Sequence, residues 1–311
     1  MPSSFAITID DIRAAARRIA DWTWRTPVVS SARLSGAYGA ALAFKCENLQ
    51  HVGAFKMRGA ANATLSLDSR QKARGVVTHS SGNHGAALAR AAKLAGIPAH
   101  VVMPHDSRPS KIANVRRFGC EPIFCEPDAA SRAAVAEATR VETGAAFIHP
   151  YDQPEVMAGQ GTTALELLEQ APQIDTVVIP VGGGGLLSGC LIAIKELRPE
   201  IQVYAAEPAW ADDAARSLST GRIEMPTRYD TVADGLRTPL GERTFPIIQS
   251  LLDGIILVTE ESIDEASETF QSLAHMRVEP SALVALAAVA TEPHRFRHRS
   301  TALVLTGGNL Q

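Results

Sequence analysis

The feature that most constrains this chain is a run of four consecutive glycines, residues 182–185, which lies between an apolar segment and a helical pattern. The β-branched residues 176–179 predict a buried strand, and the residues after the glycines predict a helix. Each glycine loses additional conformational entropy on folding, so four in succession destabilise the fold unless they serve another purpose. A bare loop at a helix N-terminus can close its N–H groups around an anion. The run therefore favours a phosphate-binding loop over an ordinary tight turn, which needs fewer glycines.

The rest of the chain alternates between short apolar runs and helical patterns, which is typical of parallel sheets joined by right-handed crossovers. A capping box at Thr8 and Asp11 marks the start of the first helix. We predict an α/β fold with two open parallel sheets, in which residues 74–151 form a small domain inserted into a large one made of residues 1–73 and 152–311. The predicted strands are 41–46, 75–80, 99–103, 121–125, 145–149, 176–179, 203–207, 255–259 and 301–306, and the main helices 9–20, 86–94, 110–118, 131–142, 160–168, 263–275 and 281–290.

The composition excludes several classes of partner. The 311 residues are 46% apolar and 20% charged, and their net charge of −3 gives no reason to expect nucleic acid or an anionic membrane. Aromatic residues make up 5%, too few for platforms that stack single-stranded nucleic acid. No signal peptide and no apolar span of roughly 20 residues is visible. We expect a cytoplasmic protein with reduced thiols, because the cysteines lack ligand spacing; they are Cys46, Cys120, Cys125 and Cys190.

Three predicted strands end in glycine-bearing loops, at residues 80–85, 182–185 and 306–309. In open α/β sheets, ligands bind outside the carboxyl ends of the strands, so these loops predict a common site. None of them completes a nucleotide-binding fingerprint: the P-loop motif is missing, and the glycine spacing at Gly182 does not match a dinucleotide-binding turn. A phosphate-bearing cofactor other than a dinucleotide fits better.

Lys56 stands at the start of a predicted alanine-rich helix, where a cation is unusual because the helix dipole is positive there. Such a position disfavours the ammonium form, which suits a nucleophilic or imine-forming amine. Lysines near helix ends are, however, mostly solvated and without a chemical role. Spacing alone leaves both interpretations open and favours the solvated one.

Six motifs occur in one order along nearly the whole chain, and together they carry a family resemblance. Their order and spacing resemble the pyridoxal-phosphate (PLP) enzymes of the tryptophan-synthase β type (fold type II), specifically serine racemases and serine/threonine dehydratases. The resemblance implies an active site in the cleft between the two domains, a homodimer, and a chemical role for Lys56. The motifs are Gly53-Ala-Phe-Lys-Met-Arg-Gly59, Ser80-Ser-Gly-Asn-His-Gly85, Ala158-Gly-Gln-Gly-Thr162, Gly182-Gly-Gly-Gly-Leu186, Glu207-Pro-Ala-Trp-Ala-Asp-Asp213 and Thr306-Gly-Gly-Asn309.

The resemblance implies that pyridoxal 5'-phosphate is the cofactor and that Lys56 carries it as a Schiff base and acts as a base on one face of Cα. The glycine loop would hold the phosphate, Asn83 the pyridine 3′-oxygen and Thr306 the pyridine nitrogen. A hydroxyl does not keep that nitrogen protonated as a carboxylate would, so the ring is a weaker electron sink. This favours β-elimination over transamination. The implied cofactor-binding residues are Phe55, Lys56, Asn83, Gly182, Gly183, Gly184, Gly185, Leu186 and Thr306.

The substrate carboxylate is expected on the N–H groups of the second motif, where a helix N-terminus favours an anion. In the serine racemases that the motif resembles, its second serine donates a proton on the face opposite the lysine. Ser81 therefore permits racemisation, with Lys56 and Ser81 as the two bases, although a serine there is also compatible with an ordinary loop hydroxyl. The implied substrate-binding residues are Ser80, Ser81, Gly82, Asn83, His84, Arg132 and Thr238.

The fifth motif resembles the divalent-cation site of serine racemases. Glu207, Asp213 and the carbonyl of Ala211 match its ligands. Two carboxylates and a carbonyl, completed by water, suit a hard ion such as Mg²⁺, Ca²⁺ or Mn²⁺ in a structural and activating role. The alternative is a solvated acidic loop.

Together these features predict a PLP-dependent ammonia-lyase that dehydrates and deaminates a β-hydroxy-α-amino acid, such as L-serine or L-threonine, to a 2-oxo acid and ammonia. One alternative is an amino-acid racemase with the same site. Another is a dehydratase of threo-3-hydroxyaspartate or phenylserine. From a different class, a non-catalytic amino-acid or PLP sensor on this scaffold is also compatible with the pattern.

Overall fold

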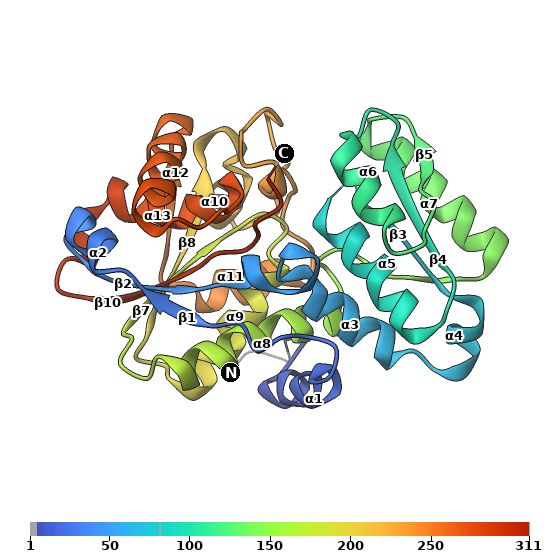
Figure 1. Ribbon diagram of the computed structural model, residues 1–311, viewed down its shortest axis with the longest axis horizontal. Coiled ribbons are helices and arrows are strands. Elements are labelled where there is room, and N and C mark those ends of the chain that lie inside the picture. The colour runs from blue at the N-terminus through green and yellow to red at the C-terminus, as the bar shows by residue number, and fades with distance from the viewer. Residues whose placement is uncertain (1–4, 81, 311) are drawn as a thin grey trace.

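The larger of two sheets forms the centre of the larger lobe in the computed structural model, which describes residues 5–80 and 82–310 (Figure 1). Its order is β1-β2-β10-β7-β8-β9, and every pair is parallel except β1–β2, which is antiparallel. The predicted parallel sheet is therefore confirmed, with one antiparallel edge strand that the sequence pattern did not predict. The strands are β1 (Val28–Ser30), β2 (Ala41–Lys45), β7 (Thr176–Pro180), β8 (Gln202–Pro208), β9 (Gly254–Val258) and β10 (Ser300–Val304).

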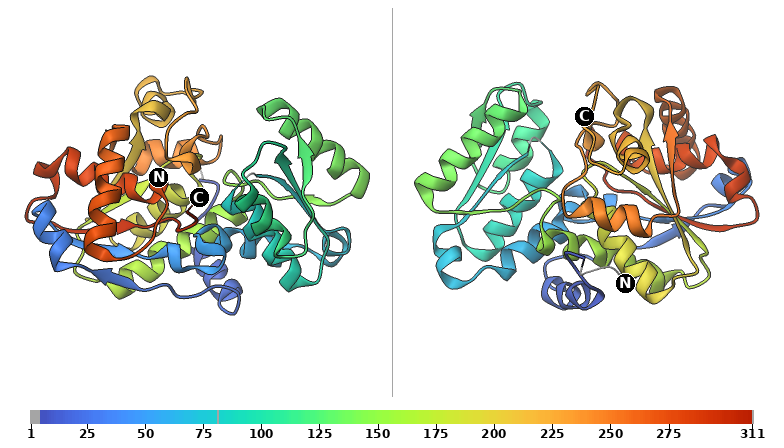
Figure 2. Two further views of the ribbon diagram at one scale, coloured as in Figure 1. Left: turned by 45° about the horizontal axis from the view of Figure 1, so that its top comes forward. Right: turned by 180° about the vertical axis from the view of Figure 1, so that it is seen from behind.

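The smaller sheet lies in a second lobe beside the first, and the two views of Figure 2 show both lobes side by side. Its order is β5-β4-β3-β6, all parallel. The exact limits of a domain at residues 74–151 stay a prediction. The strands are β3 (Val76–His79), β4 (Ala99–Pro104), β5 (Ile123–Cys125) and β6 (Ala146–Phe147), with helices α4 (Ser69–Arg74), α5 (Asn83–Ala95), α6 (Pro109–Arg116) and α7 (Ala129–Thr143) around them.

The remaining helices pack mainly on the larger sheet. The predicted capping box of the first helix is confirmed, since the Thr8 side chain accepts from Asp11 and Asp11 accepts from the Thr8 backbone. The helix predicted from Gln160 begins earlier, at Pro154, because proline is preorganised for the first helical position. These elements are α1 (Ile9–Ile19), α2 (Ala32–Tyr38), η1 (Glu47–Leu49), η2 (His51–Gly53), α3 (Lys56–Ser66), α8 (Pro154–Gln170), α9 (Gly185–Leu197), η3 (Ala209–Ala211), α10 (Asp213–Thr220), η4 (Asp234–Leu236), α11 (Thr244–Leu251), α12 (Glu260–Ala274), α13 (Pro280–Thr291) and α14 (Pro293–Phe296).

Apolar layers cover both faces of the larger sheet. One layer joins α8 and α9 to β7, and the other joins α12 and α13 to β2, β8 and β9. Helix α13 is buried on nearly all sides, as its apolar sequence predicts. Since β7 is sandwiched between these layers, its carboxyl end and the glycine loop that follows are held rigidly.

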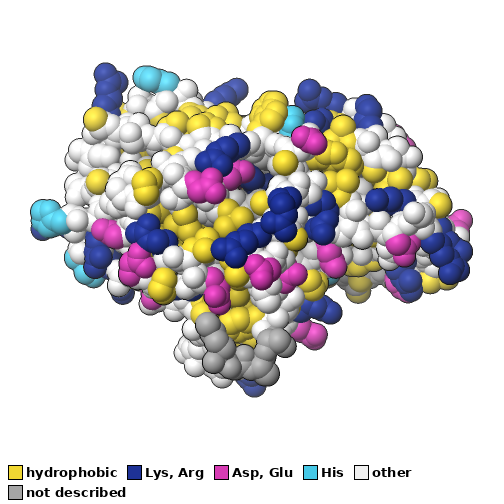
Figure 3. Space-filling view, turned by 90° about the horizontal axis from the view of Figure 1, so that it is seen from below, with side chains coloured by type: hydrophobic (Ala, Val, Ile, Leu, Met, Phe, Trp, Pro, Cys, Tyr) yellow, Lys and Arg dark blue, Asp and Glu magenta, His cyan; other side chains and the backbone are white. Residues whose placement is uncertain are grey.

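The two lobes are tied to each other by polar contacts as well as by the chain. Lys111 Nζ on α6 lies 2.6 Å from Asp234 Oδ2 on η4, so an ion pair joins the small lobe to the large one. On the face seen in Figure 3, acidic and basic side chains are interspersed, in keeping with the small net charge. Among the described helices, none is long and apolar enough to cross a bilayer.

Candidate active site

The glycine-bearing loops of the two sheets meet where their strands end. Phe55 N–H donates to the carbonyl of Thr306 (3.1 Å), and Gly308 N–H donates to that of Gly53 (2.9 Å), so the loop before α3 pairs with the loop after β10. Asn309 Nδ2 in turn donates to Asn83 Oδ1 at the start of α5 (2.8 Å). Three of the predicted motifs, far apart in sequence, are therefore in direct contact.

Lys56 is the first residue of α3, and its amine lies inside this junction. Nζ donates to the carbonyl of Pro150 (2.7 Å) and sits 5.1 Å from the centre of the Phe55 ring. Burial lowers the pKa of the amine to about 8, and the carboxyl of Glu279 opposes that shift. A larger fraction of neutral amine is available near neutral pH than an exposed lysine offers, as a nucleophile or base requires.

The four glycines form a cradle at the N-terminus of α9, and their lack of side chains is needed there. A Cβ at Gly183 or Gly185 would collide with Tyr151, and Gly184 adopts φ +85°, which other residues avoid. The Cβ position of Gly182 lies 3.4 Å from Thr238 Oγ1, which places Thr238 at the rim of the loop. Leu186, the next residue, is buried in the core and fixes the helix that follows.

Two polar side chains of the other glycine-bearing loops, Thr306 and Asn83, are those predicted to contact a pyridine ring. Thr306 Oγ1 is buried and has no hydrogen-bond partner among the described residues. Asn83 Nδ2 lies 3.1 and 3.2 Å from the two carboxylate oxygens of Glu279, whose pKa burial raises to about 7. An unpartnered buried hydroxyl calls for a ligand, because leaving it unpaired costs free energy. Together with the glycine cradle and the half-buried amine of Lys56, this donor set fits pyridoxal phosphate.

The predicted substrate loop turns directly into α5. Ser80 Oγ accepts from Gly82 N–H (3.2 Å), and the buried His84 ring contacts the carbonyl of Ile148 (3.4 Å). Arg132 on α7 has a buried Nε without a partner in the described part of the chain, and its charge adds to the effect of burial in lowering the pKa of His79. Ser81, the predicted second base, lies outside the described residues.

The predicted cation ligands come together between β8 and α10. Glu207 accepts through its two oxygens from Ala214 and Ala215 N–H (2.7 and 2.9 Å), whereas neither buried oxygen of Asp213 has a partner among the described residues. Burial raises the pKa of Glu207 to about 9 and that of Asp213 to about 7. A divalent ion would relieve the cost of both charges, so this donor set fits one. Ala211 is buried in the same loop, and the described residues hold no group of three or more acidic, histidine or cysteine side chains that could bind a metal.

The sequence patterns did not assign two side chains, Glu279 and Tyr151, to the site. Glu279 directly precedes Pro280 at the start of α13, where an acidic residue is expected only to favour the helix dipole. Its contact with Asn83 spans 196 residues, and no local pattern reveals such a pair. Tyr151 covers the glycine cradle because His149 Nδ1 accepts from the N–H groups of Tyr151 and Asp152 (3.3 and 2.8 Å) and thereby orders the loop.

Comparison with known proteins gives results that agree with this geometry. Residues 19–307 match the family model described as pyridoxal-phosphate dependent enzyme. The chain is 45% identical to a serine racemase of Arabidopsis thaliana (98% of this chain, 94% of the relative) and 44% identical to a beta-hydroxyaspartate dehydratase of Paracoccus denitrificans (97% and 96%). The crystal structure of a T.th. threonine deaminase is 45% identical and superposes with a TM-score of 0.93, covering 98% of this chain and 99% of that one.

Proposed function

The chain belongs to the pyridoxal-phosphate-dependent enzyme family, and from that premise we propose that it dehydrates and deaminates a β-hydroxy-α-amino acid such as L-serine or L-threonine. The products are a 2-oxo acid and ammonia. The observation that carries this proposal is Lys56, whose half-buried amine has a lowered pKa and which lies where the motifs at residues 53–59, 80–85 and 306–309 are in contact. The relatives support it, since they are named serine racemase, beta-hydroxyaspartate dehydratase and threonine deaminase. The family match also favours an enzyme over a non-catalytic sensor.

Pyridoxal phosphate, when bound, withdraws electrons from Cα of an amino acid, so that the Cα proton becomes acidic enough to remove. Lys56 Nζ is the group placed to accept this proton and to return one later. The N–H groups at Gly182–Gly185 and the start of α9 would hold the phosphate, Asn83 the 3′-oxygen and Thr306 the ring nitrogen. The Thr306 hydroxyl is neutral and, unlike a carboxylate, would not keep that nitrogen protonated. This supports elimination, in which the β-hydroxyl departs as water and hydrolysis then releases ammonia.

The substrate carboxylate is proposed to lie on the loop of residues 80–84, at the N-terminus of α5. Arg132, whose Nε is buried without a partner in the described chain, would supply a positive charge near it. Thr238 at the rim of the glycine loop would contact the remainder of the substrate. These placements are supported by geometry and stay proposals.

We also propose that a divalent cation, Mg²⁺ or alternatively Ca²⁺ or Mn²⁺, binds Glu207, Asp213 and the carbonyl of Ala211. Its support is the pair of Asp213 oxygens that have no partner in the described structure. The ion would neutralise two buried carboxylates and thereby stabilise the loop between β8 and α10.

The family resemblance also bears on the oligomeric state and the cellular location of the protein. The chain acts on a small molecule, and no described helix could span a membrane. We propose a cytoplasmic homodimer, as the family resemblance implies. Sedimentation equilibrium of the purified protein tests the dimer, and a monomer at micromolar concentration would contradict it.

Racemisation is the second candidate function, because the Arabidopsis relative at 45% identity is named serine racemase. It requires a proton donor opposite Lys56, and Ser81 is proposed for that role. Replacing Ser81→Ala should abolish racemisation and leave part of the elimination activity. An equal loss of both activities would remove Ser81 from this role.

A third candidate follows from the Paracoccus relative, which is named beta-hydroxyaspartate dehydratase. The reaction is the same elimination on a substrate with a second carboxylate. An assay with threo-3-hydroxyaspartate as the substrate distinguishes this candidate from a serine or threonine dehydratase.

The deciding experiment is a panel of serine, threonine, threo-3-hydroxyaspartate and phenylserine as separate enantiomers, incubated with the holoenzyme. Formation of oxo acid and inversion at Cα are measured in the same samples. Oxo acid as the main product confirms the lyase, and inversion without oxo acid favours the racemase. If none of these amino acids is turned over, the proposed dehydration is wrong.

A further inference from the structure

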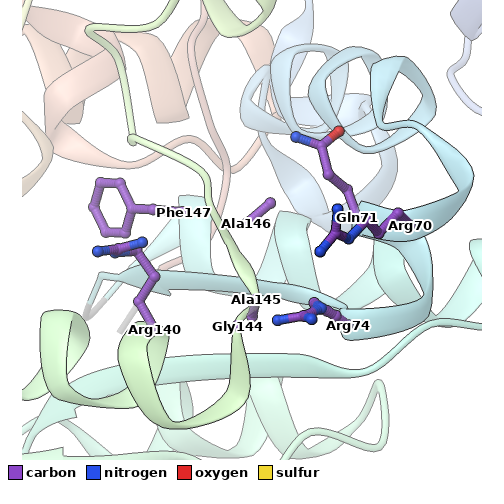
Figure 4. A pocket seen from close by; sticks show the side chains of 8 residues that line it. All are labelled: Arg70, Gln71, Arg74, Arg140, Gly144, Ala145, Ala146 and Phe147. Atoms are coloured by element: carbon purple, nitrogen blue, oxygen red, sulfur yellow. The ribbon is translucent and has the colours of Figure 1, made fainter.

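A hollow lies at the outer edge of the smaller sheet, apart from the residues of the cleft. Its volume is about 340 Å³, and it is lined by Arg70, Gln71 and Arg74 of α4, by Arg140 of α7, and by residues 144–147 (Figure 4). This volume is at the low end of the roughly 300–1,000 Å³ typical of small-molecule sites. The proposed reaction makes no use of any of these residues.

The lining carries positive charge and no acidic side chain. Arg140 is paired with Glu137 of its own helix (2.6 Å), whereas no ion pair involving Arg70 or Arg74 is present in the described part of the chain. Arg70 and Arg74 stand four positions apart on α4, and like charges at that spacing destabilise a helix. In a chain of net charge −3, this local concentration of guanidinium groups is not a general property of the surface.

The backbone beside the arginines adds a donor. The N–H groups of Ala146 and Ile148 donate to Gly75 and Val77 of the neighbouring segment (2.9 and 2.8 Å), so alternation along the strand turns the N–H of Phe147 to the outer edge. Strand β6 is the edge strand of its sheet, and this edge faces the hollow.

The shape of the hollow depends on a glycine. Gly144 ends α7 with φ +68°, and a Cβ there would collide with the Arg74 guanidinium. Arg74 is therefore laid closely against the backbone of the 144–146 segment, as Figure 4 shows, with Arg70 beside it. Two guanidinium groups and a backbone donor converge on one space.

We propose that this hollow binds a small dianion of the phosphate class. Guanidinium groups form paired, planar hydrogen bonds with phosphate oxygens, and one dianion balances the charges of Arg70 and Arg74 together. A monocarboxylate would leave one of these charges unmatched. The N–H of Phe147 supplies a neutral donor for a remaining oxygen, whereas the side-chain oxygen of Gln71 already accepts from the N–H of Asp68 (3.0 Å).

The test is calorimetric titration of the holoenzyme with inorganic phosphate at low ionic strength, so that the cofactor already fills the glycine cradle. We expect one saturable site per chain. Arg70→Gln and Arg74→Gln should each weaken it by about tenfold or more, because each removes charge-assisted hydrogen bonds. Arg74→Lys keeps the charge but loses the planar fork and should fall between Arg74→Gln and the wild type. Turnover should remain unchanged in all of these variants, which also shows that they fold.

A matched control uses a second hollow of about 270 Å³ that contains Arg90 beside Trp24 and His51. Arg90→Gln should leave phosphate affinity unchanged. The proposal is overturned if wild type shows no saturable binding, if Arg90→Gln removes it, or if the variants at positions 70 and 74 bind as wild type does. Saturation by an acidic peptide but not by phosphate would also overturn it and would assign the edge of β6 to strand pairing instead.

Discussion

Two groups of buried charges in the large lobe behave in opposite ways. In the first, Arg58 bonds both Glu47 (2.7 and 2.8 Å) and Glu166 (2.7 and 2.8 Å). Lys45 Nζ donates to Glu166, Gln170 and the carbonyl of Thr26 (2.6, 2.9 and 2.7 Å). Arg58 and Lys45 hold the pKa of Glu47 below its usual value despite burial. Every charge in this cluster has a partner within the chain.

The second group faces the cleft and lacks such partners. Lys56 Nζ donates to a backbone carbonyl, the side-chain oxygens of Asp213 have no hydrogen-bond partner among the described residues, and the carboxylate of Glu207 accepts from two backbone N–H groups. Burial shifts the pKa of each of the three towards the neutral form.

The first group consists of charges that stabilise the fold through their partners, whereas the second consists of charges that we propose are paired by a ligand. A buried charge is tolerated when it is paired, and an unpaired one costs stability unless a ligand completes it. Helix α3 contains both kinds, because Lys56 points into the cleft while Arg58, two positions later, points into the large lobe. The paired cluster thus anchors the helix that carries Lys56.

The largest effect should come from substituting Lys56 and Lys45 in two separate variants. Lys56→Ala should lower kcat by about 10⁴-fold, since it removes the positioned base, with little change in stability. Lys45→Met should instead destabilise the fold and leave kcat per folded molecule nearly unchanged. Steady-state kinetics with thermal unfolding of both variants measures this. Substantial turnover by Lys56→Ala would contradict the role given to the amine.

The sequence predicted those parts of the molecule that local patterns encode. The β-branched run before the glycines and the apolar stretch of α13 are long and regular, and both elements formed as expected. Short elements such as β1 and α4 were not predicted, because a segment of a few residues shows too little hydrophobic periodicity to be recognised.

The site was predictable to the extent that its residues lie in contiguous motifs. Lys56 and the glycine cradle were proposed in this way, although the residues alone favoured a solvated lysine and the family resemblance was needed to assign a role to it. The pairing of Arg58 with Glu166 and of Asn83 with Glu279 joins residues 108 and 196 positions apart. Such contacts are created by tertiary packing and leave no local signal.

Breaking the paired cluster should give the next largest effect. Arg58→Met leaves the buried Glu47 and the half-buried Glu166 with Lys45 as the remaining cation of the cluster, so the free energy of unfolding should fall by about 3–5 kcal/mol. Arg13→Met is the matched control, because Arg13 pairs with Asp10 on the surface, where such a pair contributes about 0–1 kcal/mol. Urea unfolding of both variants makes the measurement. Similar losses in the two would remove the distinction between the cluster and the surface.

A divalent cation should stabilise the fold by pairing with the carboxylates of the second group. Mg²⁺ at about 100 times its dissociation constant should raise the free energy of unfolding by about 2.7 kcal/mol. Asp213→Asn should abolish this gain, whereas Asp212→Asn, which alters a neighbouring carboxylate paired with Arg216, should keep it. Thermal unfolding with and without chelator provides the readout. An equal response of both variants would rule out Asp213 as a ligand.

The smallest effect is the pH dependence of the unpaired lysine in the cofactor-free protein. The Lys56 pKa is about 8 in the folded state against an ordinary value of 10.5, so between these values the unfolded chain binds more protons. The free energy of unfolding should therefore rise as pH increases from about 8 towards 10.5. Subtracting the profile of Lys56→Met isolates this slope from other groups that titrate there. A difference that falls with pH would mean that the folded protein stabilises the charged form of the amine, and the lowered pKa of Lys56 would then be wrong.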